Sequence, residues 1–236
     1  MDKKSIDVCI TPEQIHHFDL TGKIVVVTDI LRATSCMVTG IANGVKSIIP
    51  VATLEECQAY QFKGYLAAAE RGGEQVEGFD LGNSPFEYMN PALQDKSVAV
   101  TTTNGTQAIT KSLKAKSILI GAFLNLSAIA KHLVFSDYDV IVHCSGWKGL
   151  FSMEDTLFAG ALLDRLSKTH SFESDAALMA LSLYRQAKPD LSGFIHGANH
   201  AKRLSKFNIQ KDIDFCCKMD QYNLVPRLVG REIVAG

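Results

Sequence analysis

Hydrophobic residues along the 236-residue chain fall into short, continuous runs that are rich in β-branched side chains. The runs cover residues 6–10, 24–30, 47–51, 65–69, 97–102, 117–121 and 138–144. A run that is apolar at every position, and not only at every second one, is typical of a strand that is buried on both faces. The pattern therefore predicts largely buried strands at these places.

Stretches with helix-capping signals separate these runs. Helices are expected over residues 35–43, 53–63, 106–113 and 127–134. Thr53 with Glu56 forms a capping box, and Asn43-Gly44 is a typical stop signal. Single helices between strands imply right-handed crossovers. We therefore predict a three-layer α/β fold with a mostly parallel central sheet flanked by helices.

The last third of the chain is rich in helix signals. Helices are expected over residues 152–167, 174–187 and 192–204. Ser152 with Asp155 can cap the first of them. A short extended segment is expected over 223–228, where Pro226 would confine it to a sheet edge. No linker or low-complexity tract divides the chain, so we predict one domain over residues 1–236.

Composition and charge narrow the class of protein. The chain has 24 Lys and Arg against 25 Asp and Glu, so it lacks a broad basic surface for DNA or RNA. The apolar runs are too short to span a membrane, and the run 6–10 is too short for a signal-peptide core. The six cysteines show no Cys-x-x-Cys spacing, which is typical of buried, reduced thiols. We expect a cytoplasmic protein that binds neither nucleic acid nor membrane.

Polar and charged residues cluster directly after the predicted strands. Ligands of open α/β sheets bind beyond the carboxyl ends of the strands, so these loops should meet in one crevice. Asp29 and Arg32 follow the second strand and Lys148 follows the last, and we expect these three to be catalytic. The residues expected to bind substrate are Thr34, Ser35, Arg71, Asn83, Ser84, Thr102, Thr103, Asn104, Gly105, Thr106, Asn125, Ser145 and Gly146.

The loop 101–106 reads TTTNGT and leads into a predicted helix. Its hydroxyl and amide groups, with the free N–H groups of a helix N-terminus, suit an oxyanion such as phosphate or sulfonate. We expect Asn104-Gly105 to permit positive φ, which would let the backbone fold around the anion. The alternative is a turn that only caps the helix. The loop is not a P-loop, because GxxxxGK[ST] is absent.

Three carboxylates, Asp29, Glu154 and Asp155, are the expected ligands of a Mg²⁺ ion. Magnesium takes oxygen ligands and usually combines one or two carboxylates with waters. Acids at a helix start are also favoured by the helix dipole, so Glu154 and Asp155 can bind metal only if their helix points into the crevice. For Asp29 the alternative is an ion pair with Arg32 that merely closes the strand end.

The histidines are weaker candidates. His143 lies on a predicted strand and is expected in the core. His196 and His200 are four residues apart, a spacing that can bind metal on one helix face. No carboxylate motif lies near them, and we interpret them as surface residues. Asp29 could also act as a covalent nucleophile, although the pattern DxDx[TV] is missing.

The same loops resemble the 2-phosphosulfolactate phosphatase family of the coenzyme M biosynthetic route. The matching segments are 29–35 (DILRATS), 70–85 (ERGGEQVEGFDLGNSP), 101–106 (TTTNGT), 123–128 (FLNLSA), 146–149 (GWKG), 154–156 (EDT), 212–216 (DIDFC) and 225–226 (VP). They run in order over nearly the whole chain. Two departures are Cys36, where the family has Thr, and Leu150, where a basic residue is common and an anion contact is lost.

The resemblance implies a single phosphatase domain that uses Mg²⁺ to hydrolyse 2-phosphosulfolactate to 3-sulfolactate and phosphate. Such a substrate carries a phosphate, a carboxylate and a sulfonate, which agrees with several cationic and N–H-rich loops. Three alternatives stay open: a non-catalytic anion-binding domain, a phosphotransferase, and a phosphatase for a different phosphorylated hydroxy acid. The expected partner is the small phosphate ester, and a homo-oligomer is compatible with the sequence.

Overall fold

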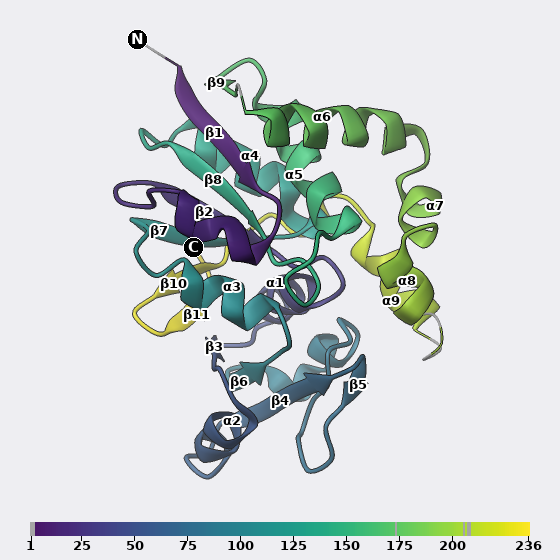
Figure 1. Cartoon of the computed structure of the whole chain (residues 1–236). Helices are drawn as coiled ribbons and strands as arrows, with labels where there is room; N and C mark the ends of the chain where they lie inside the picture. Colours follow the sequence, from purple (N-terminus) through teal and green to yellow (C-terminus); the bar gives the residue numbers. More distant parts are fainter. Residues whose placement is uncertain (1–2, 173, 205, 207–208) are drawn as a thin grey trace.

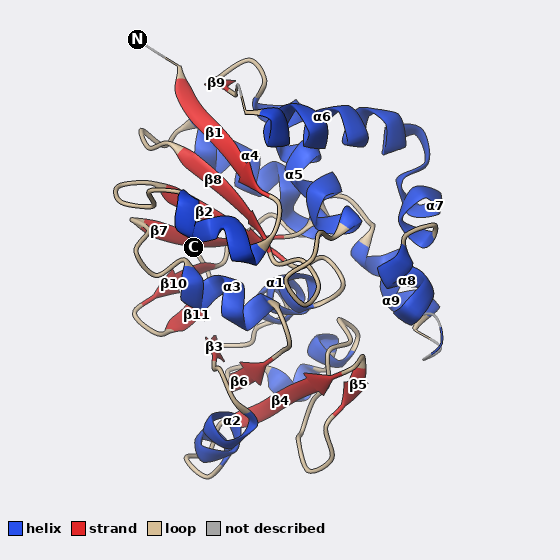
Figure 2. Cartoon of the chain, in the orientation of Figure 1, coloured by secondary structure: helices blue, strands red, loops and turns tan. Residues whose placement is uncertain are grey.

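The computed structural model describes residues 3–172, 174–204, 206 and 209–236. Helices pack against a large, mostly parallel sheet, and the C-terminal helices α6 to α9 lie together along one side (Figures 1 and 2). The strand order is β5-β4-β6-β3-β11-β10-β7-β2-β8-β1-β9. The predicted α/β class with a helical C-terminal region is therefore confirmed.

The described part of the chain contains these regular elements. The strands are β1 (Lys4–Cys9), β2 (Ile24–Thr28), β3 (Ser47–Pro50), β4 (Leu66–Arg71), β5 (Glu74–Gln75), β6 (Ser97–Thr101), β7 (Ser117–Gly121), β8 (Val140–Cys144), β9 (His170–Ser171), β10 (Arg227–Val229) and β11 (Glu232–Val234). The α-helices are α1 (Ala33–Ala42), α2 (Leu54–Gln61), α3 (Gly105–Lys111), α4 (Leu126–Val134), α5 (Met153–Leu166), α6 (Asp175–Ala187), α7 (Leu191–His196), α8 (Asn199–Leu204) and α9 (Gln210–Cys216).

The sheet consists of two parallel halves. In one half β7, β2, β8, β1 and β9 pair in parallel, and in the other β3, β6 and β4 do. Every residue of β2 and of β8 is buried, which explains why their sequences are apolar without alternation. The strands predicted from continuous apolar runs are confirmed.

The hairpin of β10 and β11 corrects the prediction of an edge strand over residues 223–228. It lies between β7 and β3 and is antiparallel to both, so it joins the two halves in the middle of the sheet. Pro226 stands just before β10, and its carbonyl accepts a hydrogen bond from the Ile120 N–H at 2.9 Å. Proline lacks a donor but keeps its acceptor, so it is compatible with the start of an interior strand.

The helical C-terminal third packs closely at one glycine. A Cβ atom at Gly160 of α5 would lie 2.0 Å from the carbonyl oxygen of Ala180 in α6. Any larger residue would push these two helices apart. The predicted helix over 192–204 is wrong as one element, because it is split into α7 and α8 at Gly197. Glycine is a poor helix former, and here it serves as the C-cap of α7.

Burial confirms two smaller predictions, those for His143 and for the cysteines. His143 is fully buried, and its Nδ1 lies 2.8 Å from the Ser112 hydroxyl. All six cysteines are buried and unpaired. Among the residues that the structure describes, no helix is long and apolar enough to cross a membrane.

Candidate active site

A small polar cavity lies where the loops after β2, β4, β6 and β8 meet the C-terminal helices. Its lining residues are Asp29, Leu31, Arg32, Glu70, Gly73, Asn83, Thr102, Thr103, Asn104, Trp147, His200, Arg203 and Leu204. Its volume of about 10 Å³ is the space of about one water molecule. A groove of about 590 Å³ adjoins it and shares Arg32, Gly73 and Asn83 with it. The cavity is therefore a closed chamber beside an open one.

Asp29 follows β2 directly and lies at the centre of the charged groups. Its Oδ1 accepts a hydrogen bond from the Ala33 N–H at 3.3 Å. Burial raises the pKa of Asp29 to about 6; His200 and the Ala33 N–H oppose the rise, and the carboxylates of Glu70 and Glu154 add to it. A buried carboxylate with acidic neighbours is a site that favours a cation.

Arg32 forms the wall between the cavity and the groove. It is 4% exposed, forms an ion pair with Asp212 of α9, and donates from Nη2 to the carbonyl of Gly73 at 2.9 Å. The hydroxyl of Ser84 donates to the other oxygen of Asp212 at 3.0 Å. Three distant segments thus fix one guanidinium at the strand end.

Asp155 holds two strand ends together. Its two carboxylate oxygens accept hydrogen bonds from the N–H groups of Ile30 (2.9 Å) and Gly146 (3.0 Å). Burial, with the charges of Asp29 and Glu154, raises the pKa of Asp155 well above its ordinary value. Because each oxygen already binds a backbone donor, the main role of Asp155 in this structure is to position the loops after β2 and β8.

Glu154 has one paired and one unpaired oxygen. Oε1 lies 2.5 Å from Nδ1 of His200, whereas the buried Oε2 has no hydrogen-bond partner among the described residues. Burial opposes ionisation, but the hydrogen bond and charge of His200 outweigh it and lower the pKa of Glu154. Glu154 is therefore an ionised, half-satisfied carboxylate, and a ligand could complete its partners.

The loop 101–106 brings Thr102, Thr103 and Asn104 to the cavity. Thr102 Oγ1 accepts from the Thr106 N–H at 3.3 Å, and Asn104 Oδ1 accepts from the Lys148 N–H at 3.1 Å. The expected positive φ at Asn104-Gly105 is wrong: φ of Asn104 is −124°, and Gly105 is not among the positive-φ glycines. Glycine is required there for space, since a Cβ would lie 2.9 Å from Oδ2 of Asp29.

Several predicted residues lie outside the cavity lining. The buried hydroxyls of Thr34 and Ser35, in the first turn of α1, donate to the backbone carbonyls of Asp29 and Ile30. The amide of Asn125 is used by the backbone of Ala122, Ile120 and Leu224. Gly105, Thr106, Ser145 and Gly146 are buried behind the lining, while Ser84 lines the groove.

Two predicted cationic residues are exposed. Arg71 donates to Thr101, with Nη2 3.2 Å from the Thr101 hydroxyl oxygen. The backbone of Lys148 has φ +48°, and its Nζ lies 5.5 Å from the centroid of the Trp147 ring. Neither lines the cavity. They stay predicted site residues at its margin.

The structure adds residues that the sequence pattern missed. The prediction of His200 as a surface residue is wrong, because its side chain is 11% exposed and contacts Glu154. The ring centroids of His200 and Trp147 lie 5.2 Å apart. The guanidinium of Arg203 also stacks on Trp147, with Cζ 3.3 Å from the ring centroid. Trp147 is the chain's single tryptophan and stands directly after a strand, a signal that could have pointed to it.

The donor set fits a magnesium ion in chemistry. No group of three or more His, Cys, Asp or Glu side chains within the described ranges is arranged to hold a metal. Magnesium, however, usually needs only one or two carboxylates together with waters. Asp29 and Glu154 provide two buried carboxylates whose charges interact, and Oε2 of Glu154 has a free coordination position.

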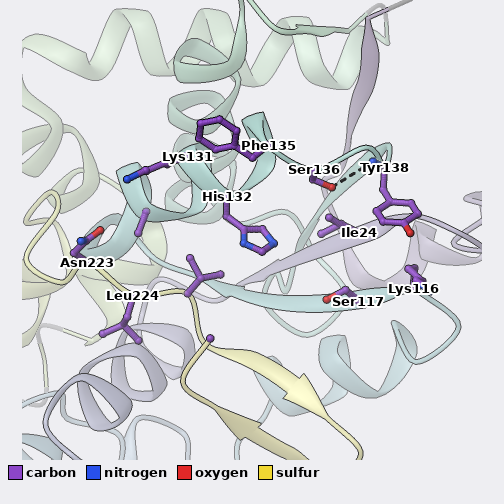
Figure 3. Close-up of a pocket in the computed structure, with 13 residues that line it drawn as sticks. Ile24, Lys116, Ser117, Lys131, His132, Phe135, Ser136, Tyr138, Asn223 and Leu224 are labelled. Carbon is purple, nitrogen blue, oxygen red and sulfur yellow. Dashed lines mark hydrogen bonds between the residues drawn. The ribbon is translucent and has the colours of Figure 1, made fainter.

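A second, larger pocket lies at the opposite ends of the strands (Figure 3). Ile24 and Ser117, the first residues of β2 and β7, form its floor, with Lys131 and Phe135 of the α4 region above. It has a volume of about 510 Å³ and no Asp, Glu or Arg side chain among its described lining residues. This pocket lacks the concentrated charge of the small cavity.

Buried carboxylates facing arginine side chains at the carboxyl ends of strands define an α/β enzyme that handles a small anionic ligand. The family model for 2-phosphosulpholactate phosphatase matches residues 9–231. The chain belongs to this family, whose name describes a phosphoric monoester hydrolase.

Curated relatives match over nearly their whole length. A protein of Clostridium novyi is 40% identical over 94% of this chain and 95% of its own. One of Caldanaerobacter subterraneus is 38% identical over 92% of both chains, and one of Clostridium acetobutylicum is 38% identical over 97% of this chain and 99% of its own. Each is named a probable 2-phosphosulfolactate phosphatase. The resemblance noted in the sequence is confirmed.

Proposed function

We propose that the protein hydrolyses the phosphate ester of 2-phosphosulfolactate, giving 3-sulfolactate and inorganic phosphate. The observation that carries the proposal is the meeting of buried Asp29 with Arg32 and Asn104 around one cavity. The family match and the names of the relatives support the same substrate.

Magnesium dependence is part of the proposal. Asp29 and Glu154 would hold the ion, supported by the free Oε2 of Glu154 and the acidic surroundings of Asp29. The bound ion would polarise the phosphoryl group and lower the pKa of a bound water. His200 keeps Glu154 ionised and oriented through its 2.5 Å contact.

The chain's own residues stabilise charge and exclude water. Arg32 offers a guanidinium whose position Asp212 and Gly73 fix, so it can offset charge on the phosphoryl oxygens without reorganising. Thr102 and Thr103 line the same cavity, and their hydroxyls would donate to the same oxygens. The walls of the closed cavity keep bulk water away and strengthen each of these interactions.

The rest of the substrate would occupy the groove beyond Arg32. Lys206 and Lys211 line that groove, in which Glu74, Glu87 and Asp212 also lie; the two lysines would pair with a carboxylate and a sulfonate. We propose that the phosphoryl group enters the closed cavity while the acidic tail stays in the groove. In organisms that make coenzyme M the reaction would belong to that route, and the unpaired thiols support a cytoplasmic location.

The test is release of inorganic phosphate from 2-phosphosulfolactate, 2-phospholactate and phosphoglycolate, each with Mg²⁺ and with EDTA. We expect release that requires Mg²⁺ and is fastest with the sulfonated ester. If all three esters stayed intact while calorimetry showed binding, the protein would be an anion-binding module. If a non-sulfonated ester were preferred, the reaction would stand with a different substrate.

A further inference from the structure

Arg203, on the short helix α8, lines the cavity together with Asp29. Its Cζ lies 3.3 Å from the centroid of the Trp147 ring. This stacking sets the plane of the guanidinium and leaves its N–H edge free to donate. The backbone of Trp147 is held by two hydrogen bonds with the backbone of Leu150: the Trp147 N–H donates at 2.8 Å, and the Trp147 carbonyl accepts at 2.9 Å.

One nitrogen of Arg203 is buried without an acceptor. Nη2 has no hydrogen-bond partner among the residues that the structure describes. Oε1 of Glu70 accepts from the Gly73 N–H at 2.6 Å, and Oε1 of Glu154 contacts His200. The buried Oε2 of Glu154 is, like Nη2 of Arg203, without a hydrogen-bond partner among the described residues. A buried charged donor without an acceptor is unfavourable, and a ligand in the cavity would provide the acceptor.

The position of Arg203 indicates which part of the proposed substrate would provide that acceptor. Arg203 lines the closed cavity with Asp29 and Thr102, and it does not line the groove proposed for the acidic tail. Arg32 lines both spaces. A group held in the cavity would therefore be lined by two arginine side chains, one from the loop after β2 and one from α8.

We propose that Arg203 is a second catalytic arginine that donates hydrogen bonds to the transferring phosphoryl group, an inference that rests on the phosphatase function proposed above. The three equatorial oxygens carry the charge of the phosphoryl group in the transition state, and an arginine that contacts them accelerates transfer strongly. The cavity has a volume of only about 10 Å³, so the side chains that line it would have to shift to admit the phosphoryl group.

The variant Arg203→Met tests this, because methionine keeps an apolar side chain against Trp147 but removes the donors. We expect kcat/KM to fall about 100-fold to 1,000-fold, by the same factor for 2-phosphosulfolactate, 2-phospholactate and phosphoglycolate. Arg203→Lys should recover only part of the loss, because an ammonium lacks the planar fork. Arg185→Met removes an exposed arginine of α6 that pairs with Asp164, and it should stay within about twofold of wild type.

Two results would overturn the proposal. One is activity of Arg203→Met within about threefold of wild type on all three esters, with unchanged circular dichroism. The other is a loss confined to the sulfonated ester, which would assign Arg203 to the substrate tail. If Arg203→Met misfolds, the same comparison is made with Arg203→Lys and Arg203→Gln.

A binding measurement separates failure of this proposal from failure of the proposed function. Titration of wild-type protein with inorganic phosphate in the presence of Mg²⁺ should show binding, and Arg203→Met should weaken it by about tenfold or more. If wild type hydrolysed no ester but this difference persisted, the phosphatase function would fail while the anion contact of Arg203 stood. Equal phosphate affinity in both proteins would contradict the contact itself.

Discussion

The two ends of strand β2 carry very different hollows. At the carboxyl end lies a cavity of about 10 Å³ that is lined by buried charges, among them Asp29 and Arg32. At the amino end lies a pocket of about 510 Å³ whose cationic lysines stand beside apolar side chains (Figure 3). The larger pocket therefore has no buried charged side chains among its described lining residues, whereas the smaller cavity has several.

Buried charge, more than volume, therefore distinguishes the candidate active site from the larger pocket. Burying a carboxylate or a guanidinium without full pairing costs free energy. Several charged side chains are nevertheless buried around Asp29. The unpaired atoms of Glu154 and Arg203 point to the same conclusion. The pocket of Figure 3 shows no such buried charge among its described residues and can be formed simply by side chains meeting at a surface.

The largest expected effect is on turnover by Asp29→Asn. Amide replaces carboxylate at nearly the same size, so the cation site should be lost while the fold is kept. We expect phosphate release to fall by about 1,000-fold or more. Wild-type activity in this variant, with Mg²⁺ present, would remove Asp29 from the mechanism.

Gly105→Ala should have a smaller but clear effect on both activity and stability. The new Cβ would lie 2.7 Å from Cβ of Ala33 and 2.9 Å from Oδ2 of Asp29. Overpacking of this kind costs about 1–3 kcal/mol of unfolding free energy, and displacing Asp29 should lower kcat/KM by about 10-fold to 100-fold. Thermal melting and phosphate release measure the two effects. Unchanged values for both would mean that this contact is not tight.

The raised pKa of Asp29 predicts a pH-dependent gain in stability for Asp29→Asn in metal-free protein. An acid with a higher pKa when folded binds more protons in the folded state, so wild type loses stability as the pH rises from about 4 to about 6. The shift to about 6 from 3.8 corresponds to about 3 kcal/mol.

Urea unfolding in EDTA measures this difference. We expect Asp29→Asn to be more stable than wild type at pH 7 and equally stable near pH 4. Equal stability at both values would show that Asp29 ionises without penalty. Added Mg²⁺ should reverse the order at pH 7 by stabilising wild type alone.

The smallest effect is expected at the pocket of Figure 3. Lys131→Met removes a cation from its rim, as Arg203→Met does from the cavity. We expect phosphate release to stay within about twofold of wild type, because surface charges at this distance are screened. A loss of activity comparable with that of Arg203→Met would make the large pocket part of the active site. It would contradict the contrast drawn between the two ends of β2.

Much of the fold could be predicted because burial on both faces leaves a direct trace in the sequence. The strands β2 and β8 read as unbroken apolar runs for this reason. The place of β10 and β11 could not be predicted, since their pairing partners β7 and β3 are far away in the chain. The register pairs Ile233 with Ile48 and Arg227 with Leu119.

Residues of the candidate site could be predicted where they stand in a loop after a strand. Asp29, Arg32 and Asn104 were found by that rule and line one cavity. His200 and Arg203 were missed because they reach it from α8, which packs across the strand ends only once the chain breaks after α7. Conversely, a hydroxyl such as that of Ser35 looks available in the sequence but serves its own helix start.

The most direct measurement is a crystal structure with Mg²⁺, inorganic phosphate and 3-sulfolactate bound. We expect phosphate in the cavity, within hydrogen-bond distance of Arg32 and Arg203, with a metal ion on Asp29. The organic acid should lie in the groove beyond Arg32. Ligand density only in the pocket of Figure 3, with the small cavity unchanged, would contradict it.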